Sequence, residues 1–370
     1  MKRRSRKTLG SVWQQAMNSM TRTALRSGAR TFRQVLANVP KAKAAVRPKV
    51  IRAKRPPARP AASKRPRGAS SARPSTRADP GESGWSAGVA IAPTGVRRFR
   101  LYKPPGTRRS ERLPLLVMLH GCGQDAAALA ASSGMNRLAR AERFLVLYPE
   151  QDRLANSQGC WNWFDTRNGR AQREAAIIDA AIEQVCIAQP VDRARIAIAG
   201  LSAGAGMAAL LATQRPARFR AVAMHSGIAP GLAHSSATAL SAMRGRRKSM
   251  LQLPSADGVF GWPPLLVIQG SADRVVAAEN GAEAVRLWAA HARARTAPSR
   301  TVQRGKRAAS TLTDYRVGKR LVARLCLVDG LGHAWSGGAP GMAYSDPAGP
   351  DAARMIWRFV ASRFAGDEAP

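Results

Sequence analysis

One pentapeptide constrains the fold of this chain more than any other feature. Residues Gly200-Leu201-Ser202-Ala203-Gly204 follow the pattern glycine, any residue, serine, any residue, glycine. An apolar run at 196–199 precedes them, and a helix-prone run at 205–212 follows. Such a pattern turns a strand sharply into a helix, with the serine in a strained conformation and the glycines avoiding clashes with the turn. We therefore expect an exposed, nucleophilic Ser202 at the carboxyl end of a strand.

From about residue 84 onward, short apolar runs alternate with stretches of helical periodicity. The strand candidates are residues 96–102, 115–119, 144–148, 195–199, 221–224, 265–269 and 321–328, and the helix candidates are 124–141, 173–188, 203–215 and 277–290. Runs without polar alternation are typical of parallel strands buried on both faces. The alternation predicts an α/β fold with a mostly parallel, doubly wound sheet, whose active residues gather at the carboxyl ends of strands.

A serine nucleophile needs a base, and in folds with this pentapeptide the acid and then the histidine follow the serine along the chain. His333 lies in a glycine-rich loop just after the expected strand 321–328, which favours it over His225, His234 and His291. Asp273 follows the expected strand 265–269, whereas Asp257 precedes that strand, and Asp314 and Asp329 fit a loop after a strand less well. We predict the triad Ser202, Asp273 and His333.

Acyl transfer also needs hydrogen-bond donors for the developing oxyanion. The backbone N–H of Ala203, next to the nucleophile, is one candidate. The second should come from the loop after the strand 115–119, which reads His120-Gly121-Cys122-Gly123-Gln124. We assign it to the Cys122 N–H and expect the His120 side chain to order the loop.

Positive charge is concentrated at the start of the chain. The net charge is +38, and residues 1–78 hold 22 Lys or Arg and no acidic residue. We expect residues 1–79 to form a basic, largely disordered extension, helical in part at 11–39 and a proline-rich linker after that, and residues 80–366 to form the catalytic domain. The extension is either a solvated tail or a means of binding an anionic surface such as a granule or nucleic acid.

Targeting and metal-binding signals are absent from the sequence pattern. No apolar run approaches the length of a transmembrane segment, and the charged start lacks the apolar run of a secretory signal, so a cytoplasmic location is expected. Cys122, Cys160, Cys186 and Cys326 have no metal-ligand spacing. Buried free thiols are the default in a reducing cytosol. We expect neither a metal nor a cofactor.

Five segments together resemble the polyhydroxybutyrate depolymerase family of esterases, over about residues 84–365. They are 120–124 (His-Gly-Cys-Gly-Gln), 160–164 (Cys-Trp-Asn-Trp-Phe), 200–204, 225–227 (His-Ser-Gly) and 330–338, which contains His333. The resemblance implies an α/β-hydrolase fold and cleavage of ester bonds in poly(3-hydroxybutyrate) or its oligomers. Relatives act on feruloyl and acetyl esters of plant polysaccharides. The family's triad falls on the same three residues.

The resemblance also leaves alternatives open. Trp161, Trp163 and Trp335 could line an apolar substrate cleft or pack in the core, and of these Trp335 has the best claim because it is two residues from the base. Cys122 and Cys160 lie in two motif segments, so a disulfide bracing the oxyanion loop competes with free thiols. A feruloyl or acetyl-xylan esterase is the alternative enzyme. A granule- or nucleic-acid-binding protein that uses its basic tail is the alternative of another class.

Overall fold

The structure is a computed structural model that describes residues 84–249 and 261–364. The extension expected at residues 1–79, its helix at 11–39 and Asp257 lie outside the described residues. The described residues belong to one compact unit of the chain. Within the described ranges, no helix combines the length and hydrophobicity that a membrane span requires.

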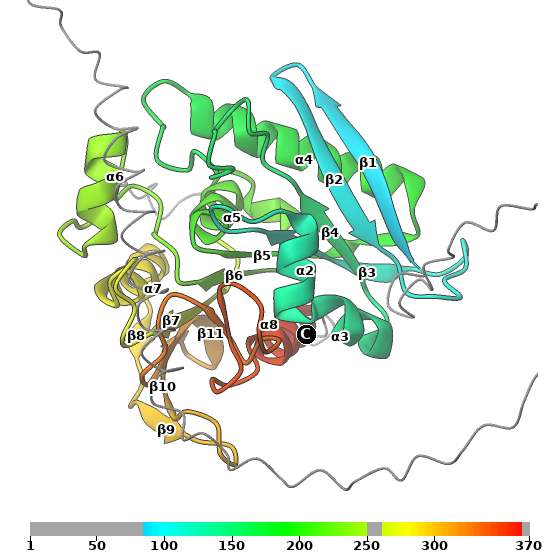
Figure 1. Cartoon of the computed structure of the whole chain (residues 1–370). Coiled ribbons are helices and arrows are strands. Elements are labelled where there is room, and N and C mark those ends of the chain that lie inside the picture. The colour runs from blue at the N-terminus through cyan, green and yellow to red at the C-terminus, as the bar shows by residue number, and fades with distance from the viewer. Residues whose placement is uncertain (1–83, 250–260, 365–370) are drawn as a thin grey trace, which may run out of the picture. The chain divides into compact units, whose positions relative to one another are not determined.

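An eleven-stranded sheet organises the described residues, in the order β1-β2-β4-β3-β5-β6-β7-β11-β10-β8, with β9 also paired to β10 (Figure 1). Its strands are β1 (Trp85–Ala92), β2 (Gly95–Tyr102), β3 (Leu113–Leu119), β4 (Leu145–Pro149), β5 (Val191–Leu201), β6 (Ala221–His225), β7 (Leu265–Gly270), β8 (Arg295–Thr296), β9 (Arg300–Val302), β10 (Ser310–Val317) and β11 (Arg320–Val328). The six central strands, from β4 to β11, are parallel. β12 (Trp335–Ser336) and β13 (Ser345–Asp346) form a separate pair.

Strand β3 shows why continuous apolar runs predict central strands. All seven of its residues are buried. Leu115 and Val117 belong to the core on one face of the sheet, and Leu116 and Met118 to the core on the other. Because side chains alternate across a strand, both faces of such a strand need apolar residues when helices cover both. The mostly parallel α/β fold predicted from the sequence is therefore confirmed.

Helices cover each face of this sheet. The core on one face includes α4 (Arg170–Ala188), α5 (Ala203–Gln214), α6 (Ser236–Met243) and α7 (Glu279–His291). The core on the other includes α2 (Ala126–Ser133), α3 (Met135–Glu142) and α8 (Ala352–Phe364). A short 3-10 turn, η1 (Pro216–Arg218), connects α5 to β6. This layering leaves the carboxyl ends of the parallel strands for the loops that carry the predicted site residues.

Two differences from the sequence-based expectation have local causes. The helix expected at 124–141 is two helices, because Gly134 has φ 65° and ends α2 with a left-handed residue. Strand β10 was not expected, since its sequence Ser-Thr-Leu-Thr-Asp-Tyr-Arg-Val is polar and only two of its eight residues are buried. Continuous apolar runs mark strands buried on both faces, and partly exposed strands near a sheet edge lack such runs.

Candidate active site

Ser202 sits at the turn between β5 and α5, in a backbone conformation that non-glycine residues rarely adopt. Its φ is 56° and its ψ is −119°. The Ser202 N–H donates to the carbonyl oxygen of His225 at 2.8 Å, which anchors the turn to the end of β6. Such strain persists only where surrounding contacts hold it, and it is common at functional sites.

The two glycines of the pentapeptide have different neighbours. A Cβ at Gly200 would lie 2.4 Å from the carbonyl carbon of Gly204, so this glycine permits the tight turn itself. A Cβ at Gly204 would lie 2.2 Å from the carbonyl oxygen of Leu119 and 2.5 Å from that of His120. Gly204 is therefore needed because α5 begins directly against the end of β3 and the loop that follows it.

Ser202, His333 and Asp273 form one chain of hydrogen bonds. The Nδ1 atom of His333 lies 2.8 Å from the Oδ2 atom of Asp273, and its Nε2 atom lies 3.0 Å from the Oγ atom of Ser202. A carboxylate only accepts, so Nδ1 carries the imidazole proton and the Ser202 hydroxyl donates to the bare Nε2. This direction is the one that a general base requires.

Asp273 is held as an anion by several donors. Its Oδ1 atom accepts the N–H groups of Val275 and Val276, both at 2.9 Å, and its side chain is fully buried. Burial alone would raise the pKa of Asp273, but the hydrogen bond and charge of His333, together with the two backbone bonds, lower it overall. The carboxylate can therefore orient the imidazole and stabilise an imidazolium.

In the loop between β3 and α2, hydrogen bonds occupy every amide around Cys122. Gly121 N–H donates to Gln124 Oε1 at 3.0 Å, Gly123 N–H to the Gln158 carbonyl at 3.0 Å, and Gln124 N–H to the Gly121 carbonyl at 3.2 Å. Among the described residues, the Cys122 N–H has no partner.

Ala203 is the first residue of α5, where amides have no acceptor within the helix. Both predicted oxyanion donors are thus available.

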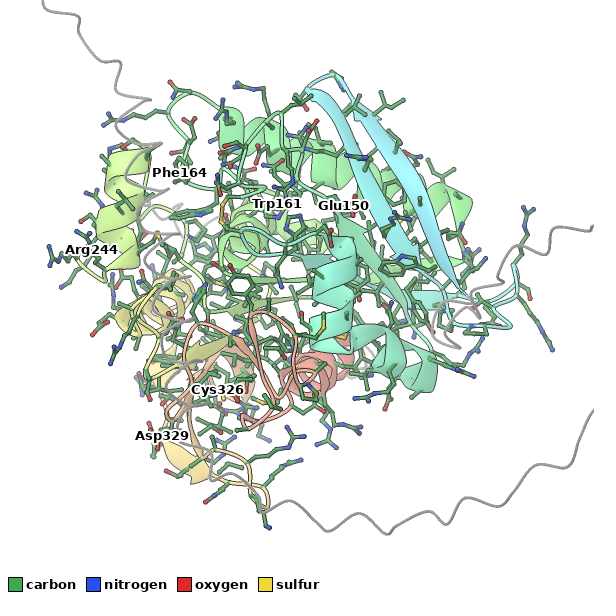
Figure 2. The ribbon with its side chains drawn as sticks, viewed as in Figure 1. Glu150, Trp161, Phe164, Arg244, Cys326 and Asp329 are labelled. Atoms are coloured by element: carbon green, nitrogen blue, oxygen red, sulfur yellow. A yellow bond between two sulfur atoms is a disulfide. The ribbon has the colours of Figure 1, made fainter. Side chains whose placement is uncertain are left out.

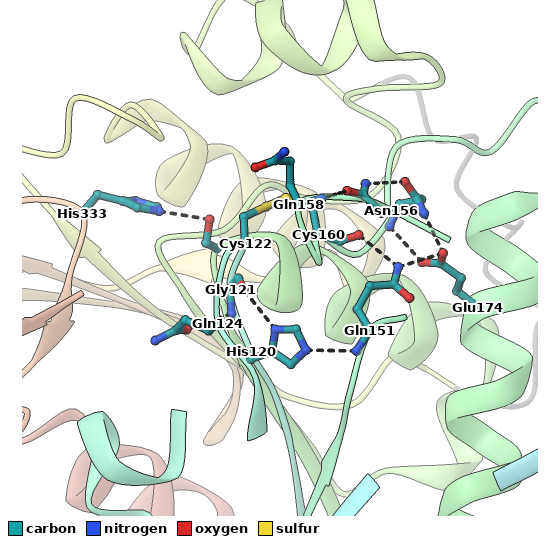
Figure 3. Close-up of a disulfide and its surroundings, with 12 residues drawn as sticks. His120, Gly121, Cys122, Gln124, Gln151, Asn156, Gln158, Cys160, Glu174 and His333 are labelled. Atoms are coloured by element: carbon teal, nitrogen blue, oxygen red, sulfur yellow. Dashed lines mark hydrogen bonds between the residues drawn. A yellow bond between two sulfur atoms is a disulfide. The ribbon is translucent and has the colours of Figure 1, made fainter. Parts of the chain in front are cut away.

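A disulfide joins Cys122 to Cys160, while Cys186 and Cys326 are free and buried (Figure 3). The default expectation of free thiols was therefore wrong for the first pair and correct for the second. Spacing along the sequence could not decide this, because the fold brings together two loops 38 residues apart. The bond holds the loop with the free Cys122 N–H to the segment that precedes Trp161.

A buried polar network lies beside this disulfide (Figure 3). The Glu174 carboxylate accepts from Asn162 Nδ2 at 2.6 Å and from Gln151 Nε2 at 2.8 Å. Gln151 Nε2 also donates to the Cys160 carbonyl, and its backbone N–H donates to His120 Nε2 at 3.0 Å. His120 Nδ1 in turn donates to the Gly121 carbonyl, and burial lowers the pKa of His120. The predicted role of His120 in ordering the loop thus has a defined set of contacts.

Two of the three tryptophans predicted to contact substrate are inaccessible. Trp161 packs against His120 with ring centroids 5.4 Å apart, and Trp335 stacks on His225 at 5.1 Å; each is 0% exposed. Their apolar rings fill the core behind the loops, so these two predictions of substrate contact need correction. Trp163 is half-buried, and a Cβ at Gly206 in α5 would lie 3.1 Å from its ring.

His225, which is not predicted as the base because it precedes the acid in sequence, lies at the end of β6 next to Ser202. Its Nε2 atom accepts the Ser336 N–H at 3.0 Å, so its Nδ1 proton points to Ser226 Oγ, 3.1 Å away. Burial lowers the pKa of His225 to about 3. The neutral imidazole of His225 thus links two parts of the site. The His225 carbonyl at the end of β6 accepts the Ser202 N–H, and the ring accepts the N–H of Ser336, three residues after His333.

Comparison with known proteins agrees with this architecture. Residues 97–296, which are 200 of the 370 residues, match the family described as esterase PHB depolymerase. The chain belongs to this family. Poly(3-hydroxyalkanoate) depolymerase C of Paucimonas lemoignei is 32% identical over 203 residues, covering 52% of this chain and 48% of that protein. Feruloyl esterase B of Neurospora crassa is 25% identical over 208 residues, covering 53% and 70%.

The chain thus spans about half the length of the depolymerase that it matches. Among solved structures, an acetyl xylan esterase from Aspergillus awamori has a TM-score of 0.52 at 19% identity, covering 67% of this chain and 94% of that one. At that identity the likeness concerns the fold, and it confirms the α/β-hydrolase fold expected for an esterase PHB depolymerase family member.

Proposed function

We propose that this esterase PHB depolymerase family protein is a serine carboxylesterase that cleaves ester bonds of poly(3-hydroxybutyrate) or its oligomers. The observation that carries the proposal is the hydrogen-bonded chain from Ser202 through His333 to Asp273. It is supported by family membership and by the similarity to a poly(3-hydroxyalkanoate) depolymerase.

In the proposed mechanism, Ser202 Oγ attacks the ester carbonyl carbon while its proton passes to His333 Nε2. The carbonyl oxygen becomes an oxyanion that accepts the Cys122 and Ala203 N–H groups. His333 then protonates the leaving alkoxide as the C–O bond breaks, which leaves an acyl group on Ser202. Water, deprotonated by His333, attacks this acyl group and releases the acid, and the proton returns to Ser202.

Hydrolysis of a short-chain nitrophenyl ester tests the mechanism. Replacing Ser202 by Ala should abolish turnover, with a loss of about 10⁴-fold or more, while the folded state persists. Wild-type turnover by that variant would remove Ser202 from the mechanism.

The substrate class needs a separate comparison, because a feruloyl esterase resembles this chain over a similar length. We expect the protein to hydrolyse a 3-hydroxybutyrate trimer with a higher kcat/KM than methyl ferulate. The reverse order would favour the feruloyl or acetyl-xylan alternative.

Trp163 is the remaining candidate for contact with the acyl chain, so Trp163→Ala should raise KM more for the trimer than for nitrophenyl acetate.

We further propose that residues 1–78 tether the enzyme to an anionic surface, on the basis of their 22 basic residues. Deleting them should leave turnover of soluble esters intact while weakening salt-sensitive binding to DNA or polyester granules. Equal binding by the truncated protein would contradict the tether.

The cytoplasmic location stays a prediction, and the Cys122–Cys160 disulfide weighs against it because disulfides persist mainly in oxidising compartments. Alkylating the thiols in intact cells at harvest, before lysis, would measure the fraction of protein that carries the bond where it resides.

A further inference from the structure

A cavity separate from the Ser202 site lies between α8 and the β10–β11 hairpin. Its volume is about 620 Å³, and it contains no residue of the hydrogen-bonded chain or of the Cys122 loop. Leu312 and Leu321 from the strands and Met355 and Phe359 from α8 give it an apolar part. A pocket of this size can hold a small organic molecule.

The remaining lining of this cavity is strongly cationic. Eight of its lining side chains are Lys or Arg, and one is acidic, Asp351. In Figure 2, side chains that end in nitrogen gather at the lower edge of the view, near the places of β9 and α8 in Figure 1. Like charges at such density repel one another unless carboxylates or a ligand neutralise them.

Carboxylates of the described residues neutralise only part of this charge. Asp314, buried beside the cavity, pairs with Arg324 at 2.5 Å and with Arg316 at 3.0 Å. Asp351 pairs with Arg354 at 3.7 Å. Within residues 84–249 and 261–364, the cavity's other five cations have no carboxylate partner; they are Arg304, Arg307, Lys319, Arg358 and Arg363.

Arg363 gives the clearest sign of an unmet interaction. Its Nε atom is buried and has no hydrogen-bond partner among the described residues, and its guanidinium carbon lies 5.3 Å from the centre of the Phe359 ring. Burial, and then the charges of Arg324 and Arg316, lower the pKa of Arg363. A buried guanidinium donor without an acceptor is unfavourable, and an anion in the cavity would relieve both the desolvation and the repulsion.

We propose that this cavity binds an oligophosphate, either free or carried by a nucleoside. Planar guanidinium groups match the oxygens of phosphate in paired hydrogen bonds, and several unpaired cations suit a ligand with several negative charges. The apolar part formed with Met355 and Phe359 would accept a nucleobase when one is present. This proposal is independent of the esterase activity.

Titration calorimetry on the full-length protein tests the proposal, with ATP in one arm and inorganic triphosphate in the other, at 0.3 M salt to suppress binding by the basic tail. The double substitution Arg358→Gln and Arg363→Gln should weaken binding of whichever probe binds by about tenfold or more. The matched control, Arg98→Gln with Arg100→Gln, removes the same charge from β2, near the opposite edge of the sheet, and should leave affinity unchanged.

Tighter binding of ATP than of inorganic triphosphate would assign the site to a nucleoside ligand, and equal binding would assign it to the phosphate chain alone. Either result supports the proposal if only the cavity variant loses affinity. The proposal fails if neither probe binds, or if both double variants lose affinity equally. It also fails if a 3-hydroxybutyrate oligomer or a fatty acid binds more tightly than both probes and is lost in the cavity variant.

Discussion

The Oγ atom of Ser202 lies 3.0 Å from the Nε2 atom of His333, although the two residues are 131 positions apart in the sequence. β5 ends one residue before the serine, and the loop after β11 supplies the histidine. β6 and β7 separate these two strands in the sheet, so the His333 loop reaches across the ends of both. The backbone N–H of Ala272 bonds to the Leu331 carbonyl at 3.1 Å and thereby joins this loop to the Asp273 loop.

The acid of the proposed triad can be tested by removing charge while keeping shape. We expect Asp273→Asn to lower kcat by about 10³- to 10⁴-fold, because the amide favours the wrong imidazole tautomer. Asp329→Asn is the matched control, since Asp329 is exposed and its carboxylate contacts Ser271 Oγ at 3.4 Å. A larger loss for Asp329→Asn than for Asp273→Asn would transfer the role to Asp329.

Gly204 should tolerate no side chain. The Cβ of Gly204→Ala would lie 2.2 Å from the Leu119 carbonyl oxygen, so either the turn or the end of β3 must move. We expect a loss of about 3 kcal/mol or more in the free energy of unfolding, measured with urea. Gly261→Ala is the control, because among the described residues no atom beyond its chain neighbours lies within 4 Å of the added Cβ. Similar stability of the two variants would mean that the elbow is looser than the structure indicates.

The disulfide should stabilise the fold by about 2 to 4 kcal/mol, as expected for a closed loop of this length. Reductant should lower the stability of the wild type, whereas a variant with Cys122→Ser and Cys160→Ser should begin at the lower value and not respond. Denatured, unreduced protein should titrate two thiols, those of Cys186 and Cys326. Four thiols in the purified, unreduced protein would contradict the bond.

His225 should make stability depend on pH in the acid range. Its pKa is about 3 in the folded protein, against an ordinary value of 6.5. The unfolded chain therefore binds an extra proton below pH 6.5, and stability falls as the pH drops from 6.5 towards 3, by a total on the order of 5 kcal/mol. Above pH 6.5 this group contributes no pH dependence.

The measurement for His225 is the free energy of unfolding across pH 4 to 8, in the wild type and in His225→Gln. The variant should lose stability less steeply between pH 6.5 and 4. Parallel curves for the two proteins would show that another group produces the acid dependence.

The sequence alone determined much of the site. The glycines around Ser202 mark a turn that few other sequences can form. The order serine, acid, histidine, together with positions just after expected strands, then predicted Asp273 and His333 from several candidates. The continuous apolar runs predicted the central parallel strands because strands covered on both faces need apolar residues at every position. The pentapeptide and the apolar runs are local features, so a single stretch of chain is enough to reveal each of them.

Only the tertiary structure decided which side chains meet across distant loops. It paired Cys122 with Cys160, buried Trp161 and Trp335 behind the site, and placed Glu174 of α4 in a buried network that a helical sequence pattern does not distinguish from a surface position. It also gathered arginines of α8 around one cavity. Burial and proximity depend on how the layers pack, and residues far apart in sequence carry no local sign of it.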